Sequence, residues 1–245
     1  MYIYDNMKIH YTDVNQAESK TIIALHGWGQ NIEMMDLLLN SFSKNYRLII
    51  FDLPGHGEST EPPRAYELID FVKILEKFVK DNNIKNPIFV GHSFGGKLSL
   101  LYASRNKVDK LILLAPPYKK SEAKVDIRIR LLKKLKFIPG TNLILQKLKN
   151  KLGSTDYRNA SEVMRAVMVK HVNTDITEDV KKIKCPTLIV WGDNDLAVPI
   201  ETAYELEKLI PDSGVVLYKN SSHYAYLENK ENLLKVLDVF LNGKE

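Results

Sequence analysis

Short apolar runs rich in isoleucine, valine and leucine alternate along this chain with longer stretches of helical period. This order is typical of βαβ units and predicts an α/β protein with a mainly parallel central sheet. The runs between residues 21 and 191 lack polar alternation, so we expect those strands to be buried on both faces. The expected strands are Thr21–Leu25, Arg47–Phe51, Pro87–Val90, Lys110–Ala115, Thr187–Trp191 and Val215–Tyr218, with a further edge strand that includes Lys8–Tyr11.

Stretches of helical period between these runs predict the helices that flank the sheet. The last of them carries one continuous apolar stripe, which would cover a face of the sheet. The expected helices are Tyr66–Lys80, Phe94–Ser104, Glu201–Leu209 and Lys230–Leu241.

The alternation stops between residues 116 and 184, where three amphipathic stretches follow one another without a strand-like run. Pro139-Gly140 and Gly153-Ser154 separate them, as breakers between helices do. The sequence therefore predicts a helical insertion between two parts of an α/β core. Its apolar stripes are Ile127, Leu131, Leu135 and Ile138; then Ile144, Leu148 and Leu152; then Val163, Val167 and His171 with Met164 and Met168.

Composition limits the class of protein further. A chain of 245 residues that is 44% hydrophobic can bury a large core and needs neither disulfides nor metal to fold. The single cysteine, Cys185, excludes an internal disulfide and a cysteine-based zinc site. No apolar run approaches the roughly 20 residues of a transmembrane helix, and Met1–Asp13 lacks the features of a secretory signal. We expect a cytoplasmic protein without a transmembrane segment.

The net charge of +5 is unevenly distributed. Residues 118–184 hold 17 basic and 7 acidic side chains, so the rest of the chain is slightly acidic. Such a basic insertion is either a solvated helical surface or a binding surface for an acidic partner, and the sequence leaves both open. Nucleic acid is an unlikely partner because no aromatic residues are interleaved with the basic ones, and contact with anionic lipid stays open.

The sharpest local motif is Gly91-His92-Ser93-Phe94-Gly95, which follows an apolar strand and opens a helix. In that setting G-x-S-x-G forms a sharp turn that projects the serine hydroxyl above the sheet, next to the positive end of the new helix. Ser93 is therefore the candidate nucleophile. The alternative is a glycine-rich turn whose serine only caps the helix.

A serine nucleophile needs a base that takes its proton. Of the six histidines, His223 is the best candidate, because it follows the last expected strand, at the sheet edge where α/β active sites lie. His92 is inside the turn and cannot reach back to Ser93, while His10 lies in an edge strand and His171 in the insertion. A plain surface role for His223 is the alternative.

A carboxylate after a late strand would hold the histidine in place. Asp193 and Asp195 both follow the strand that ends at Trp191, and one of them would act while the other forms the turn. The negative oxygen of a tetrahedral intermediate needs two donors. The backbone N–H groups of Phe94 and Trp28 are the candidates, although Trp28 could instead only fill the core.

Five motifs, taken together and in their order along the chain, resemble the α/β-hydrolase superfamily. The resemblance implies Ser93 as nucleophile, Asp195 as acid, His223 as base, and residues 118–184 as a helical cap inserted in a core of residues 1–117 and 185–245. It also implies a structural role for His56 rather than a catalytic one. The motifs are His26-Gly27-Trp28-Gly29, Asp52-Leu53-Pro54-Gly55-His56-Gly57-Glu58-Ser59, the serine turn, Gly192-Asp193-Asn194-Asp195 and His223.

The resemblance implies a serine hydrolase that cleaves a small-molecule carboxylic ester without a metal or another cofactor. Serine at position 93 disfavours the dehalogenase and epoxide hydrolase branches, whose nucleophile is aspartate. The His-Gly-Trp-Gly loop and basic cap are similar to pimeloyl-acyl-carrier-protein methyl ester esterases, which implies an acidic carrier protein as a partner. A carbon–carbon bond hydrolase or lyase with the same triad, or a non-catalytic binding protein of this fold, are the alternatives.

Overall fold

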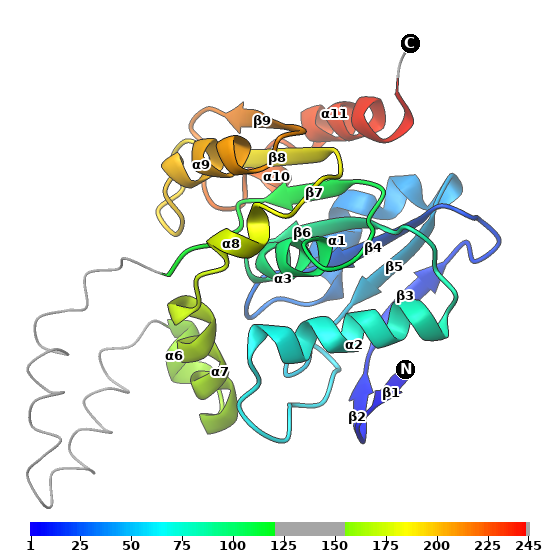
Figure 1. The fold of residues 1–245 in the computed structure, drawn as a ribbon, viewed down its shortest axis with the longest axis vertical. Helices are drawn as coiled ribbons and strands as arrows, with labels where there is room; N and C mark the ends of the chain where they lie inside the picture. The colour runs from blue at the N-terminus through cyan, green and yellow to red at the C-terminus, as the bar shows by residue number, and fades with distance from the viewer. Residues whose placement is uncertain (121–154, 244–245) are drawn as a thin grey trace, which may run out of the picture.

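The computed structural model describes residues 1–120 and 155–243. In these residues the chain forms a central seven-stranded sheet of order β3-β5-β4-β6-β7-β8-β9 (Figure 1). Here β3 pairs antiparallel with β5, and all the other neighbouring strands of this sheet pair parallel. The expected α/β-hydrolase fold with a mainly parallel sheet is therefore confirmed. The strands are β3 (Tyr11–Val14), β4 (Thr21–Leu25), β5 (Arg47–Phe51), β6 (Ile88–His92), β7 (Leu111–Leu114), β8 (Thr187–Gly192) and β9 (Ser213–Tyr218).

The N-terminal edge differs from the expectation of a single strand through Lys8–Tyr11. That segment is divided at His10 between a separate two-stranded hairpin and β3. The His10 backbone N–H donates to Ser59 Oγ at 2.8 Å, and its Nδ1 lies 2.7 Å from Asp52 Oδ2. These bonds to the loop after β5 take the place of strand pairing at this residue. The hairpin consists of β1 (Tyr2–Tyr4) and β2 (Met7–Ile9).

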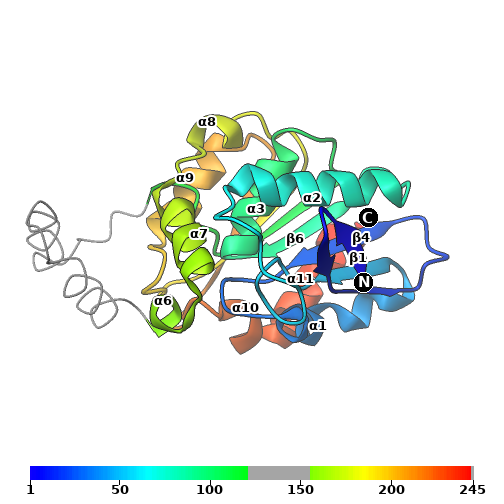
Figure 2. The ribbon, with the colours of Figure 1, turned by 90° about the horizontal axis from the view of Figure 1, so that it is seen from below.

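Helices cover both faces of the sheet (Figures 1 and 2). The buried side chains of α2, α3, α8 and α9 belong to one hydrophobic cluster, and those of α1, α10 and α11 belong to the other. The sequence expectation omitted α1, α8 and α10. The first group is α2 (Leu68–Asp81), α3 (Phe94–Ala103), α8 (Thr177–Val180) and α9 (Glu201–Leu209); the second is α1 (Ile32–Leu39), followed by a 3₁₀ helix (Asn40–Lys44), with α10 (Ala225–Glu228) and α11 (Lys230–Asn242).

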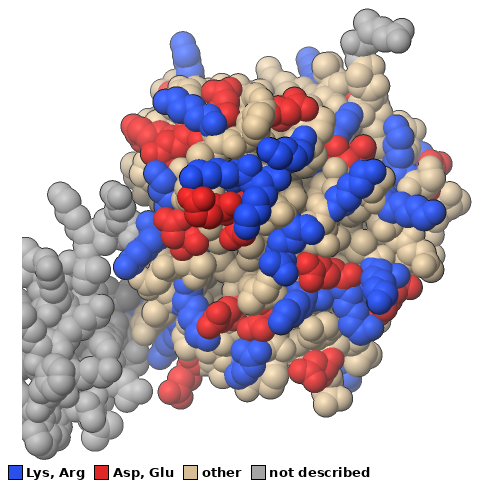
Figure 3. All heavy atoms as spheres, viewed as in Figure 1, with Lys and Arg blue, Asp and Glu red and all other residues tan. Residues whose placement is uncertain are grey.

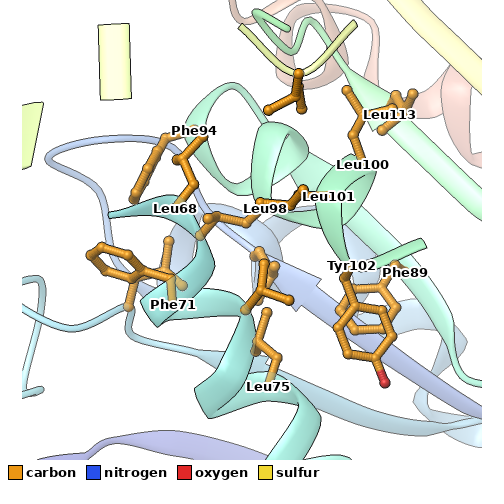
Figure 4. Close-up of a cluster of buried hydrophobic side chains, with 14 of the residues drawn as sticks. Leu68, Phe71, Leu75, Phe89, Phe94, Leu98, Leu100, Leu101, Tyr102 and Leu113 are labelled. Atoms are coloured by element: carbon orange, nitrogen blue, oxygen red, sulfur yellow. The ribbon is translucent and has the colours of Figure 1, made fainter. Parts of the chain in front are cut away.

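The expectation that the central strands are buried on both faces is confirmed by β4. Ile23 and Leu25 face one cluster while Ile22 and Ala24 face the other, and all four are fully buried. The helix α3 is equally enclosed, since every residue from 94 to 102 is buried. Figure 4 shows its apolar side chains packed between α2 and the sheet. The segment that follows Ser93 is thus held rigidly on all sides.

The described part of the expected insertion is helical and lies at the carboxyl ends of the strands, beside α3 (Figure 2). Its third apolar stripe forms α7, which buries Met164, Val167 and His171, while Val163 and Met168 are only partly buried. The other two stripes lie outside the described residues. The described helices of residues 118–184 are α6 (Thr155–Asn159), α7 (Glu162–Asn173) and α8, whose bounds are given above.

The surface of the described residues carries charges of both signs. On the face in Figure 3, basic and acidic side chains are interspersed. Residues 121–154 hold nine basic and two acidic residues. Much of the basic excess of the insertion therefore lies outside the described residues. In residues 1–120 and 155–243, no helix is long and apolar enough to cross a membrane.

Candidate active site

Ser93 stands on a strained turn between β6 and α3. Its φ of 49° and ψ of −111° lie in a sparsely populated region, which costs on the order of 1–3 kcal/mol for a residue with a Cβ. Close backbone contacts on either side hold this turn. A Cβ at Gly91 would meet Gly96 Cα at 2.5 Å, and one at Gly95 would clash with the carbonyl oxygen of Leu25. The glycines therefore permit a turn that leaves the Ser93 side chain half-buried at the sheet edge.

His223 and Asp195 come together above the ends of β8 and β9. His223 Nδ1 lies 2.7 Å from Asp195 Oδ2, and the Asp195 side chain has no solvent exposure. The other carboxylate oxygen accepts hydrogen bonds from the N–H groups of Ala197 at 2.8 Å and Val198 at 2.9 Å. Because both oxygens are engaged, the carboxylate has one orientation and the imidazole is aligned with it.

The second acid candidate, Asp193, is exposed, and its backbone N–H donates to Tyr218 O at 3.1 Å. The structure therefore brings Asp195, and not Asp193, to His223. Within the described residues, Ser93 makes no side-chain hydrogen bond to His223. The ring of His92, the residue before Ser93, has its centre 4.8 Å from that of the His223 ring. Catalytic hydrogen bonds are often long before substrate binds.

The loop after β4 lies against the serine turn. Gly95 N–H donates to His26 O at 3.1 Å, and the Trp28 and Phe94 rings meet edge to face at 5.4 Å. Phe94 is the first residue of α3, so its N–H is one of those without a helical partner. The structure thus brings together the two residues whose N–H groups were predicted to bind the oxyanion.

A buried histidine connects the loop after β4 to the loop after β5. His26 Nε2 accepts from Leu53 N–H at 3.0 Å, and its Nδ1 lies 2.7 Å from Gly27 O. Burial lowers the pKa of His26 to about 4, so the ring is neutral and can accept with one nitrogen while the other donates. The His56 ring stands 5.0 Å from that of Trp28, in a packing position.

Sequence reasoning set His92 aside, yet its ring connects three loops of the site. His92 Nε2 lies 3.1 Å from His223 O, and its Nδ1 lies 3.1 Å from Gln30 Oε1. The same Gln30 oxygen accepts from Gly27 N–H at 2.8 Å. Full burial lowers the pKa of His92 to about 3. The neutral ring has one N–H and so donates to only one of these two oxygens at a time, and it lies between the loop of His223 and the loop of residues 26–30.

Two further residues near the site were missed or set aside. His171 of α7 packs its ring 4.5 Å from that of Phe94 and lies parallel to Trp28 at 6.4 Å. Lys97 is fully buried one turn after Ser93. A lysine within the otherwise apolar run of α3 was the signal that could have identified it.

Within residues 1–120 and 155–243, no group of three or more His, Cys, Asp or Glu side chains is arranged to hold a metal ion.

This strand–serine–helix turn, with an Asp–His pair at the neighbouring strand ends, is the arrangement of the α/β hydrolases. Residues 20–141 and 133–230 match the family described as alpha/beta hydrolase fold. The AB hydrolase superfamily protein YisY of Bacillus subtilis is 31% identical, over 93% of each chain. The chain therefore belongs to the α/β-hydrolase family and is an enzyme of that family.

Two other similarities agree with this assignment. A pimeloyl-[acyl-carrier protein] methyl ester esterase of Aliivibrio fischeri is 23% identical, over 93% of this chain and 95% of the relative. The crystal structure of MGS-M2, an α/β hydrolase from a deep-sea metagenome library of the Medee basin, superposes with a TM-score of 0.79. It covers 100% of this chain and 98% of that chain at 20% identity, and so supports the fold alone.

Proposed function

We propose that the protein is a serine hydrolase that cleaves a carboxylic ester through an acyl-enzyme on Ser93, His223 and Asp195. The observation that carries the proposal is the 2.7 Å contact between His223 and a fully buried Asp195, next to a serine on a strained turn. The carboxylate keeps the proton on His223 Nδ1, so Nε2 is left free to accept one. This arrangement turns a weakly nucleophilic hydroxyl into a reactive one.

In the first half-reaction, Ser93 Oγ attacks the ester carbonyl carbon while its proton passes to His223 Nε2. The negative oxygen of the tetrahedral intermediate accepts hydrogen bonds from the Trp28 and Phe94 N–H groups. When the intermediate collapses, the C–O bond to the alcohol breaks and His223 returns the proton to the departing alcohol. In the second half, His223 takes a proton from water, whose oxygen attacks the acyl carbon. The bond from the acyl carbon to Ser93 Oγ then breaks, the acid leaves, and His223 returns the proton to Ser93 Oγ.

Turnover of p-nitrophenyl esters of increasing acyl length tests this proposal. The wild type should hydrolyse at least one of them, and Ser93→Ala should lower kcat by about 10⁴–10⁶-fold, since members of a triad act as a unit. A fluorophosphonate should label Ser93 and leave the Ser93→Ala protein unlabelled. More than a tenth of wild-type activity in Ser93→Ala would refute the mechanism, and a protein that turns over no ester would favour carbon–carbon bond cleavage or a binding role.

We further propose that residues 118–184 form a cap over a core of residues 1–117 and 185–245, and that its basic charge attracts an acidic acyl-carrier protein. The support is the basic excess of this segment and the similarity to the carrier-protein ester esterase of A. fischeri. Exposed charges act across roughly 8 Å at physiological salt, so salt should weaken this attraction.

For a carrier-bound ester, kcat/KM should fall steeply between low and moderate salt, while a neutral short ester should respond little. Reversal of Arg130, Lys133 and Lys134 to Glu should reproduce the loss for the carrier-bound ester alone. Equal salt responses of the two substrates, with no effect of the reversals, would leave the cap as a solvated surface.

A further inference from the structure

A lysine ammonium lies inside the protein, next to the nucleophile turn. Lys97 belongs to the first turn of α3, where its backbone N–H donates to Ser93 O at 3.0 Å, and its side chain has no solvent exposure. Its Nζ donates to two backbone carbonyl oxygens, those of His171 at 3.0 Å and Thr174 at 2.6 Å. The proposed reaction uses neither the Lys97 ammonium nor these two carbonyls.

Both carbonyls belong to the carboxyl end of α7, where the last turn of a helix leaves carbonyl oxygens without helical partners. A positive charge is favourable at this end because the helix dipole is negative there. Lys97 is therefore a cap for α7 that comes from another helix. It joins the nucleophile helix to the helix of the insertion.

Burial of this ammonium has a cost that packing alone would not justify. A charged group inside a protein loses its hydration, and desolvation lowers the pKa of Lys97 to about 8, although Asp175 acts in the opposite direction. A methionine or leucine would fill the same space without that cost. The lysine therefore does something that an apolar residue cannot, and the only groups it bonds in the described residues are the two carbonyls.

Lys97 bonds the backbone carbonyl of His171, and the ring of His171 contacts the two residues proposed to bind the oxyanion. His171 packs on Phe94 at 4.5 Å and lies parallel to Trp28 at 6.4 Å. Apart from His171, α7 buries only Met164 and Val167 among its described residues. Elsewhere α7 is tied to the core by its N-cap, Ser161, whose Oγ donates to Glu61 at 2.8 Å, and by Lys170 Nζ, which donates to Ala65 O at 2.8 Å. The two bonds from Lys97 Nζ are the ones that join its carboxyl end to α3.

We propose that Lys97 is a positioning residue: it ties the carboxyl end of α7 to the nucleophile helix and thereby holds the His171 ring against Trp28 and Phe94. This inference rests on the proposed function in so far as the Trp28 and Phe94 N–H groups bind the oxyanion. Loss of the tie should loosen α7 and let the Trp28 loop move. Because oxyanion stabilisation depends on donors that are already in place, the loss should appear in kcat.

Three variants separate this role from packing. Lys97→Met ends one atom short of the lysine nitrogen and removes all the side-chain donors, whereas Lys97→Gln has a similar reach to methionine and keeps two N–H donors. Lys182→Met is the matched control, because Lys182 is exposed and pairs only with Asp179 in the described residues. Thermal unfolding shows first that each variant is folded.

The first measurement does not depend on activity. Hydrogen exchange followed by mass spectrometry reports opening of the peptides from α7. Exchange in residues 162–174 should become about tenfold faster in Lys97→Met, less so in Lys97→Gln, and not at all in Lys182→Met. Unchanged exchange in Lys97→Met would overturn the tie itself, whether or not the wild type hydrolyses esters.

The second measurement uses p-nitrophenyl acetate, with active sites counted by fluorophosphonate labelling. Per active site, kcat should fall about tenfold in Lys97→Met with KM changed less than about twofold, and Lys97→Gln should recover part of the loss. Faster α7 exchange with an unchanged kcat would overturn the positioning role. An inactive wild type would instead refute the proposed function and leave the exchange result to judge the tie.

Discussion

Replacement of Asp195 by asparagine tests the candidate triad with almost no change in shape. Asp195 Oδ1 accepts from the N–H groups of Ala197 and Val198, and Oδ2 faces His223 Nδ1. In Asp195→Asn the single amide oxygen would keep the two backbone donors, so the amide N–H₂ would face the imidazole. His223 Nδ1 must then accept, which moves the ring proton to Nε2.

A ring with its proton on Nε2 cannot take the proton of Ser93. The loss in kcat should therefore be about 10⁴-fold, as for the corresponding change in other Ser-His-Asp enzymes, or about 5 kcal/mol in the barrier. The unfolding free energy should change little, because the Ala197 and Val198 N–H groups keep the amide oxygen as their acceptor and the new amide N–H₂ donates to the His223 ring.

The assay is p-nitrophenyl ester turnover per active site, with Asp193→Asn as the matched control in the same loop. Asp193 is exposed, and in the described residues it is Asp195, not Asp193, that pairs with His223, so the Asp193→Asn variant should keep wild-type kcat. If Asp193→Asn is the worse variant, or if Asp195→Asn keeps more than about a tenth of wild-type kcat, the assignment of the acid is wrong.

Two further predictions concern stability. Gly95→Ala should destabilise the fold by about 2–3 kcal/mol, because its Cβ would clash with Leu25 O. The control is Gly214→Ala, which should be neutral or stabilising because nothing lies within 4 Å of the new Cβ. Equal melting temperatures for the two variants would contradict this prediction. Burial lowers the pKa of Lys97 from 10.5 to about 8, so the unfolded chain binds more protons between those values and stability should rise with pH there. The wild type should gain up to about 3 kcal/mol relative to Lys97→Met from pH 8 to 10.5 in chemical denaturation, and a constant difference would show that the ammonium is not destabilised by burial.

The sequence predicted the parts of the molecule whose signals are local. The serine turn was recognisable because the glycines that flank Ser93 are needed within five residues of chain. Most of the sheet was predictable for the same reason, since each buried strand is a single apolar run. His223 could be chosen because it follows a strand end. The residues alone left Asp193 and Asp195 open, and the family resemblance implied Asp195; the geometric reason, a contact to His223 that spans 28 residues, appears only in the fold.

The elements that the sequence did not reveal depend on partners far away in the chain. The predicted edge strand is broken at His10 by bonds to residues 42 and 49 positions away, and no pattern around His10 announces them. By contrast, α1 had a local signal that was overlooked: Asn31 accepts from Glu33 N–H as its N-cap, and the helix buries residues 32, 35, 38 and 39 at helical spacing.

Lys97 shows why the insertion side of the site is the hardest part to predict. A lysine recognised from sequence would be expected to pair with a carboxylate or to reach solvent, and hydropathy would place it on an exposed helix face. Its actual partners are backbone carbonyls 74 and 77 residues away, and backbone groups carry no residue identity that a sequence pattern could disclose. In this protein the proposed reacting groups are therefore recognisable from their motifs, while the contacts between α7 and α3 are recognisable only in the fold.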